Sequence, residues 1–259
     1  MNNKTIKEIN TLYDSNQLTD EMIDILKHDT RQGVKKILKK IEKKKQKQQE
    51  LIHDFEKLKK FDNQYKNNNI KLIAGIDEAG RGPLAGPVVA ASVILPDDFK
   101  LLGLTDSKQI NKIDRDMFFE YITKHALSYS VEVIDESIID KINIYQATIL
   151  AMKNSYKRLK IKPDFLLIDA VNIEVNDIPY EPIIKGDTKS LSIAAASILA
   201  KVTRDRIMLN YHQKYPQYKF NKHMGYGTKE HLSAIEANGI TPIHRKTFSP
   251  IKEILKLKQ

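Results

Sequence analysis

Four acidic residues stand beside predicted strand ends, and acids grouped in this way are suited to binding metal ions. They are Asp77, Glu78, Asp169 and Asp187. The first two follow the apolar stretch 72–76, the third follows the stretch 165–168, and the last lies just before a helix predicted at 190–211. Ligands of open α/β sheets bind at the carboxyl ends of the strands, so we expect the four side chains to meet there. Clustered carboxylates repel one another unless cations neutralise them, and Mg²⁺ and Mn²⁺ prefer oxygen ligands.

Taken singly, each acid also has an ordinary structural explanation. Asp77 and Glu78 could form a capping pair or a surface turn, Asp169 could cap the next segment, and Asp187 could be the N-cap of a helix. Neighbouring side chains on a strand point to opposite faces, so Asp77 and Glu78 share a site only if the strand ends or bulges there. We expect the break at Gly80 to allow this. Two divalent ions about 3.5–4 Å apart would then activate water and stabilise a leaving oxygen at phosphorus.

Two glycine-flanked loops could bind a nucleic acid beside these acids. Gly80-Arg81-Gly82 is neither a P-loop nor a dinucleotide fingerprint, and it is either a simple turn or a cradle for a nucleic-acid backbone. Tyr226 lies within the second loop, at 224–228. An aromatic ring held between glycines can stack on a sugar or base, although it can also be an ordinary packed residue.

Other polar residues give weaker signals. No serine nucleophile motif of the form G-x-S-x-G occurs. Nothing pairs His223, His231 or His244 with a nucleophile, so we expect each to be a surface or loop residue. Asp205 is expected to form an intrahelical ion pair with its neighbouring arginines rather than to bind a metal.

The elements that must position these residues alternate along the second part of the chain. Apolar, β-branched stretches predict strands at 72–76, 88–95, 129–134, 165–168 and 182–185. Helical patterns lie at 111–127, 137–140, 144–159, 190–211 and 229–238. The first two strands are close together and are therefore expected to pair antiparallel, whereas later strands alternate with helices. This order predicts the α/β class, with a mixed sheet covered by helices.

The first part of the chain has a different, helical character. Apolar residues at helical spacing predict helices around 6–12, after Thr19, and from Thr30 onward. The lysine-rich run 43–49 interrupts the last apolar face, which predicts either one long basic helix or a helix pair. We divide the chain into a helical basic extension at 1–69 and a catalytic domain with a C-terminal helical segment at 70–259. The lysine face is either simply solvated or in contact with nucleic acid.

Composition limits the function further. The chain has 259 residues and a net charge of +10, which favours a polyanionic partner, although the charge could also serve solubility alone. It has no cysteine, which excludes disulfides, zinc–thiolate sites and thiol nucleophiles. No apolar run approaches the roughly 18 residues that span a bilayer, and the N-terminus lacks the apolar centre of a signal peptide. A cytoplasmic monomer without membrane contact is the default expectation.

These residues together resemble the bacterial ribonuclease HII family, the type 2 ribonucleases H. The similar segments are 74–88, 106–108, 168–170, 185–187, 192–205 and 225–228. The resemblance extends in order over about residues 71–250. It implies a ribonuclease H-like fold with a five-stranded mixed sheet flanked by helices. It also implies an endoribonuclease that cleaves the RNA strand of RNA–DNA hybrids and nicks duplex DNA 5′ of single embedded ribonucleotides, leaving 3′-hydroxyl and 5′-phosphate ends.

The resemblance also assigns roles to individual residues. The family's catalytic and metal-binding acids fall on the four acids named above, with two Mn²⁺ or Mg²⁺ ions per site. The loop that contacts the ribose 2′-hydroxyl falls on Gly80, Arg81 and Gly82, and the tyrosine that stacks on the next deoxyribose falls on Tyr226. Lys108 falls where the family tends to place a lysine that contacts the substrate. The 2′-hydroxyl is the group that distinguishes RNA from DNA.

The N-terminal extension separates this chain from many members of the family. A few bacterial members carry a helical extension, whereas the related ribonuclease HIII type has a differently folded N-terminal domain. No alternating strand pattern is present here, so we assign the chain to type HII. Rival functions are a junction resolvase of the same fold, a silent hybrid-binding protein and a metabolic phosphotransferase. The Gly80–Gly82 loop argues against a resolvase, which has no 2′-hydroxyl to bind. The presence of all four acids argues against a silent binding protein, and the absence of a P-loop argues against a phosphotransferase.

Overall fold

The computed structural model describes residues 4–107 and 109–256. The chain forms two compact units, Met1–Asp54 and Phe55–Gln259, which meet within helix α3 (Gln32–Asn63). The domain limits predicted from composition, 1–69 and 70–259, stay a prediction. No helix in the described part of the chain is long and apolar enough to cross a membrane.

The N-terminal unit is a small helical module. Helices α1 (Ile6–Asp14) and α2 (Asp20–Lys27) pack with the first part of α3. The Thr19 side chain accepts a hydrogen bond from the Met22 amide and so caps α2, as predicted. Its core is formed by apolar side chains at the predicted helical spacing: Ile9, Leu26, Val34, Ile37 and Ile41.

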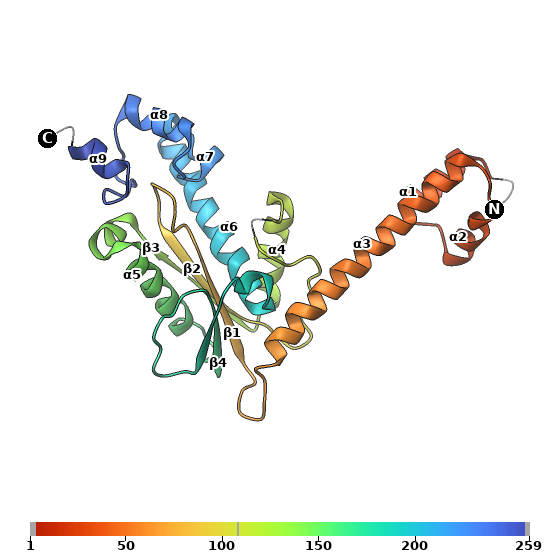
Figure 1. Ribbon diagram of the computed structural model, residues 1–259, viewed down its shortest axis with the longest axis horizontal. Helices are drawn as coiled ribbons and strands as arrows, with labels where there is room; N and C mark the ends of the chain where they lie inside the picture. Colours follow the sequence, from red (N-terminus) through yellow and green to blue (C-terminus); the bar gives the residue numbers. More distant parts are fainter. Residues whose placement is uncertain (1–3, 108, 257–259) are drawn as a thin grey trace. The chain divides into compact units, whose positions relative to one another are not determined.

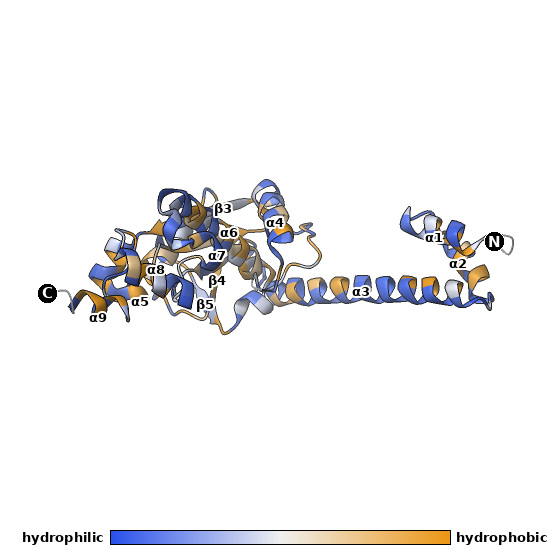
Figure 2. Cartoon of the chain, turned by 90° about the horizontal axis from the view of Figure 1, so that it is seen from above, coloured by the Kyte–Doolittle hydropathy of each residue, from blue (hydrophilic) through white to orange (hydrophobic). Residues whose placement is uncertain are grey.

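The lysine-rich run 43–49 lies inside the continuous helix α3, so the single long helix is the correct one of the two alternatives. Hydrophobic and hydrophilic segments alternate along α3 in Figure 2, as expected for a helix with one apolar face. The last turns of α3 belong to the second unit. Phe55 and Leu58 are buried there against apolar side chains of the sheet and of helix α6 (Leu191–Lys214). Asp62 accepts a hydrogen bond from the Ser192 amide at 2.9 Å.

The second unit is built on the predicted five-stranded mixed sheet (Figure 1). Its strands are β1 (Ile73–Ala79), β2 (Val88–Ile94), β3 (Ser128–Ile134), β4 (Phe165–Asp169) and β5 (Tyr180–Ile183), in the order β3-β2-β1-β4-β5. Strand β2 pairs antiparallel with β1 and β3, whereas β4 pairs parallel with β1 and β5. The antiparallel pairing of the first two strands is therefore confirmed.

Helices cover both faces of this sheet. Helix α5 (Glu136–Lys157) packs on one face, and α6 (Leu191–Lys214) packs with α4 (Lys112–His125) on the other. Helix α5 contains the two helices predicted from sequence, which meet at Asn143, where the backbone φ is 67°. The chain continues through the short elements η1 (Gly186–Thr188), η2 (Pro216–Tyr218), α7 (Phe220–His223), α8 (Lys229–Asn238) and α9 (Ile251–Lys256).

The approach of α6 to the central strand depends on one glycine. A Cβ atom at Gly75 would lie only 2.1 Å from the Ser192 carbonyl carbon. The small, apolar side chains in the first turns of α6 are buried on all sides, as the sequence predicted. This close contact holds α6 against β1, two residues before the first acid of the predicted site.

Candidate active site

All four predicted acids line one pocket at the carboxyl ends of β1 and β4. The pocket has a volume of about 430 Å³. Its lining also contains the rest of the predicted site that the structure describes, together with other polar residues: Gly80, Arg81, Gly82, Ser107, Arg115, Ser197, Lys201, Arg204 and Tyr226. The expectation that distant segments meet at the strand ends is therefore met for these residues. Lys108 lies outside the described residues.

Asp77 is the most deeply buried of the acids. Its side chain is 5% exposed and accepts a hydrogen bond from the Glu78 amide at 2.7 Å. Burial, together with the negative charges of Glu78 and Asp169, raises the pKa of Asp77 well above its usual range. A hydrogen bond from Ser197 of α6 acts in the opposite direction. The ionised form of Asp77 is therefore costly unless a cation is near.

Strand β1 runs three residues beyond the predicted range 72–76 and ends at Ala79, directly before the expected break at Gly80. Both acids keep regular pairing with β2, Asp77 with Ala91 and Glu78 with Ala90. Both line the pocket because the parallel pairing with β4 ends at Ile76, which leaves this end of β1 open on one side. The two acids therefore share the pocket at the end of the strand.

A tight turn after β5 positions the other two acids. Asp169 ends β4 and accepts a hydrogen bond from the Gly186 amide at 2.6 Å. A Cβ atom at Gly186 would lie 2.5 Å from Ile193 Cδ1 and 3.2 Å from Asp169 Oδ1, so a larger residue would displace these two side chains. The next residue, Asp187, is 9% exposed. The hydrogen bond from Gly186 therefore keeps the residue before Asp187 next to Asp169.

The donor set fits hard divalent cations. It consists of carboxylate oxygens, which Mg²⁺ and Mn²⁺ prefer, and a bound cation would offset both the burial of Asp77 and the neighbouring charges that raise its pKa. In residues 4–107 and 109–256, no three Asp, Glu or His side chains converge closely enough to enclose an ion.

The two glycine-flanked loops meet at the mouth of this pocket. A Cβ atom at Gly82 would lie 3.6 Å from the Tyr226 ring, so the two predicted substrate-binding segments lie next to each other. The Tyr226 side chain is 44% exposed, so its ring is accessible. Arg81 extends toward Glu78, with 3.4 Å between Nη1 and Oε1. This geometry presents peptide groups and an aromatic ring side by side.

Ser107 and Arg115 line the site without having been singled out in the sequence. The Arg115 guanidinium donates to the Ser107 carbonyl at 2.8 Å, and the Ser107 and Ser197 hydroxyl oxygens are within hydrogen-bond distance at 3.0 Å. These contacts tie the segment around residue 107 to α4 and α6. Only the position of Ser107 in the segment 106–108 could have suggested it.

Two predictions about polar side chains were wrong in part. His223 and His231 are neither surface nor loop residues, because they are 8% and 0% exposed and belong to α7 and α8. His244 lies in a loop after α8, as predicted, but it is 0% exposed. Each forms a hydrogen bond with a main-chain group: His223 with the Tyr218 carbonyl, His231 with the Tyr226 carbonyl, and His244 with the Thr241 amide. Asp205 forms its ion pair with Lys201 at 2.8 Å rather than with the neighbouring arginines.

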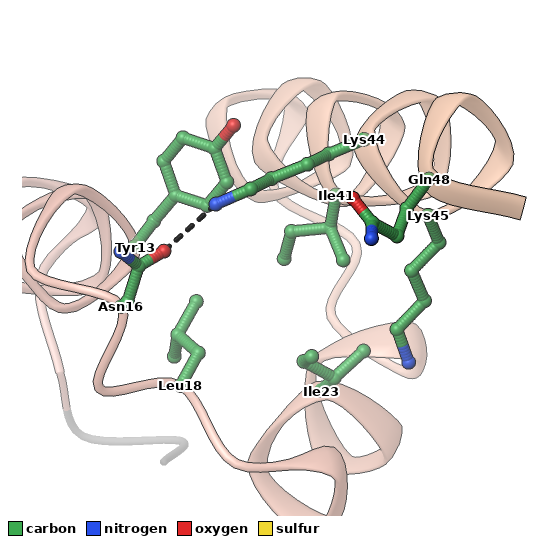
Figure 3. Close-up of a pocket in the computed structure, with 8 residues that line it drawn as sticks. All are labelled: Tyr13, Asn16, Leu18, Ile23, Ile41, Lys44, Lys45 and Gln48. Atoms are coloured by element: carbon green, nitrogen blue, oxygen red, sulfur yellow. Dashed lines mark hydrogen bonds between the residues drawn. The ribbon is translucent and has the colours of Figure 1, made fainter. Parts of the chain in front are cut away.

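The N-terminal unit has a pocket of its own, of about 360 Å³ (Figure 3). Apolar side chains from its three helices form the walls, and Lys44 donates to Asn16 at 2.8 Å. Lys45 pairs with Asp20 at 2.7 Å. No carboxylate is among the residues that line this pocket, whereas all four predicted acids line the pocket in the second unit.

Comparison with known proteins agrees with this division. The family model for ribonuclease HII matches residues 74–251, and the model for the ribonuclease HII N-terminal domain matches residues 5–66. The ribonuclease HII of Oceanobacillus iheyensis is 51% identical over 247 residues, which cover 95% of each chain. That of Bacillus cytotoxicus is 48% identical over 255 residues, which cover 98% of each chain.

Solved structures show the same fold. The ribonuclease H2 of Pyrococcus horikoshii OT3 matches with a TM-score of 0.63 and 25% identity, covering 72% of this chain and 98% of that one. The ribonuclease HII of Archaeoglobus fulgidus, solved in complex with PCNA, matches with a TM-score of 0.61 and 25% identity, covering 69% and 96%. The chain belongs to the ribonuclease HII family, metal-dependent endonucleases that cleave the RNA of RNA–DNA hybrids.

Proposed function

We propose that this enzyme also nicks duplex DNA on the 5′ side of single embedded ribonucleotides and leaves 3′-hydroxyl and 5′-phosphate ends. The observation that supports this most strongly is the placement of four acids, the Gly80–Gly82 loop and Tyr226 around one pocket. Asp77, Glu78, Asp169 and Asp187 would hold two Mg²⁺ or Mn²⁺ ions. When bound, such ions supply an activated water and stabilise the leaving oxygen at phosphorus.

Recognition of the ribonucleotide is assigned to the loops. The carbonyls of Gly80 and Arg81 already accept hydrogen bonds from Arg245, whereas the amides of Arg81 and Gly82 donate to no acceptor in the described part of the chain. Those amides are available to bind a 2′-hydroxyl, the group that an all-DNA strand lacks. The accessible Tyr226 ring would stack on the next sugar, and Lys108 would contact the substrate.

A duplex with one ribonucleotide tests this function. The labelled duplex is incubated with the enzyme and Mg²⁺ or Mn²⁺, beside an all-DNA duplex of the same sequence, and the product ends are mapped. We expect one nick 5′ of the ribonucleotide and no cleavage of the all-DNA duplex. A nick at another position, or equal cleavage of both duplexes, contradicts the assignment.

The substrate implies a cytoplasmic enzyme, and we expect a monomer in size-exclusion chromatography with light scattering.

We further propose that one face of α3 increases the affinity for the hybrid. Exposed lysines recur there at spacings of four, three and four residues: Lys36, Lys40, Lys43 and Lys47. This spacing places them on one side of the helix, over about 16 Å at about 1.5 Å per residue. None of them forms an ion pair within the described chain, whereas Lys45 does. Unpaired charges at this spacing are suited to a phosphate backbone.

Substitution in the full chain tests the α3 face, because deletion of residues 1–68 would remove the core residues Phe55 and Leu58. The four lysines are changed to glutamine, and hybrid binding is measured across a salt series. We expect the slope of log affinity against log salt to fall by up to about 0.9 per lost phosphate contact. The matched control changes four exposed lysines that precede β1 or β4 in the chain: Lys71, Lys157, Lys160 and Lys162. Equal effects in both variants contradict the proposal.

A further inference from the structure

Two arginines are buried beneath the substrate-binding loops. Arg204 of α6 is 1% exposed, and Arg245, which follows α8, is 0% exposed. In the described part of the chain, both guanidinium groups donate only to main-chain carbonyls. A buried charge without a carboxylate partner is costly, and here six hydrogen bonds to carbonyls offset that cost.

The acceptors of these six hydrogen bonds show what the arginines connect. Arg245 donates to the carbonyls of Gly80 at 2.5 Å, Arg81 at 2.9 Å and Gly86 at 2.9 Å. Arg204 donates to Pro87 at 3.0 Å, Ala85 at 3.1 Å and Met224 at 3.0 Å. Five acceptors lie in the segment 80–87, and the sixth lies two residues before Tyr226. The arginines therefore bridge the two loops that line the pocket.

Glycine at two positions makes this bridge possible. A Cβ atom at Gly80, where φ is +100°, would lie 2.2 Å from Arg204 Nε. A Cβ atom at Gly225, where φ is +87°, would lie 2.5 Å from the Ala85 carbonyl oxygen. Direct main-chain bonds reinforce the contact, since the Leu84 amide donates to the Gly225 carbonyl at 2.9 Å. The two loops thus form one packed body around the guanidinium groups.

Both groups remain charged at neutral pH. Burial lowers the pKa of Arg204 to about 10 and that of Arg245 to about 9, with the charge of Arg204 contributing to the second effect. Lysine in either place would keep the charge but would lack the planar, three-sided donor set that reaches three carbonyls at once. Geometry rather than charge alone is therefore what arginine supplies here.

We propose that Arg204 and Arg245 are positioning residues that set the spacing between the Gly80–Gly82 loop and the Tyr226 ring, and thereby determine which phosphodiester is cut. This inference rests on the proposed roles of those two segments in recognising the ribonucleotide and its neighbour. The spacing matters because a displacement of about 1 Å can cost about 100-fold in rate. Neither arginine touches the substrate in this role.

The test uses a duplex with four consecutive ribonucleotides, whose products report the position of each cut. Arg204→Lys and Arg245→Lys are compared with the wild type at 15 °C, with folding checked by circular dichroism. We expect the wild type to cut at one dominant bond, and each variant to spread its cuts over several bonds with kcat/KM lowered about 10- to 100-fold. A variant that is folded and still cuts at the single wild-type bond overturns the inference.

A matched control separates positioning from loss of stability. Tyr218→Phe removes a buried hydroxyl that donates to the Asn238 and Gly239 carbonyls, in the same part of the core but outside the bridge. We expect this variant to be less stable and yet to cut at the wild-type bond. Spreading of the cuts in Tyr218→Phe as well would assign the effect to general destabilisation and overturn the inference. If the wild type itself fails to distinguish a single ribonucleotide from DNA, the proposed function fails instead.

Hydrogen exchange gives a test that does not depend on the folding of a variant. In the wild-type protein, the amides of Leu84, Gly86 and Tyr226 donate to the carbonyls of Gly225, Ile243 and His223. Two loops bridged by the arginines open together, so these three amides should exchange with one common opening free energy. Opening equilibrium constants of the two loops that differ by more than about tenfold, or about 1.4 kcal/mol in opening free energy, contradict the bridge.

Discussion

A chain of hydrogen bonds fixes the buried histidines in their neutral form. The Thr241 amide donates to His244 Nδ1 at 2.8 Å, so the proton of His244 must lie on Nε2. That proton can then be donated to His231 Nε2, 3.0 Å away, which leaves His231 with its own proton on Nδ1. His231 Nδ1 in turn lies 2.9 Å from the Tyr226 carbonyl. A second proton on either ring would oppose a donor already in place.

Acid should therefore destabilise this region. Burial lowers the pKa of both His231 and His244 from 6.5 to about 4. A lowered folded-state pKa means that the stabilisation is complete above pH 6.5 and is lost as the pH falls through about 4, because the unfolded chain then binds more protons. At 1.36 kcal/mol per pH unit, a fall from pH 7.5 to pH 4.5 removes about 2.5 kcal/mol per histidine, and less than twice that for the coupled pair.

Urea unfolding at pH 7.5 and pH 4.5 measures this effect. The carboxylates contribute equally in all variants, so the difference between wild type and the double variant His231→Gln/His244→Gln isolates the two imidazoles. We expect the pH dependence of the unfolding free energy to be smaller in the double variant by about 2.5–5 kcal/mol. The exposed His53 provides the control, and His53→Gln should behave like the wild type. An unchanged pH dependence in the double variant would refute this explanation.

Two further substitutions test how the site is built. Gly75→Ala should displace α6, because its Cβ would lie 2.1 Å from the Ser192 carbonyl carbon; we expect a loss of about 1–3 kcal/mol in urea unfolding and about 100-fold in kcat. Gly239→Ala is the control: its φ of +78° strains any L side chain although no atom lies within 4 Å of the added Cβ, so this variant should lose stability and keep its activity. Full activity in Gly75→Ala would contradict the close contact. Tyr226→Ala should change the unfolding free energy by less than about 0.5 kcal/mol, since the side chain is 44% exposed. The same variant should cleave at the RNA–DNA junction about tenfold or more slowly, whereas Tyr226→Phe should cleave there like the wild type. Equal activity of the Ala and Phe variants would exclude a stacking role.

Much of the fold could be predicted because its signals are local. The β-branched runs, the helical spacing of apolar residues and the cap at Thr19 are each contained in a few consecutive residues. The same is true of the antiparallel start of the sheet, which follows from the short link between its first two strands. The four acids could be grouped because strands of an α/β sheet end at a common edge.

The errors concern residues whose surroundings come from distant parts of the chain. His231 and His244 are buried because Thr241 and the Tyr226 carbonyl satisfy their nitrogens, and nothing near either histidine in the sequence indicates this. Arg204 likewise sits in a helix that the sequence shows correctly, but its acceptors lie 20 to 119 residues away. The continuation of β1 through Glu78 depends on its partner β2.

The most direct test of the metal assignment is cleavage by Asp77→Asn. This substitution keeps the shape of a side chain that is 5% exposed. It removes the negative charge of Asp77, which lies next to those of Glu78 and Asp169. We expect the variant to fold like the wild type in circular dichroism and thermal melting, and to cleave neither a hybrid nor a duplex with one ribonucleotide at any Mg²⁺ or Mn²⁺ concentration. Cleavage by the folded variant at the wild-type rate would contradict the central role of these acids.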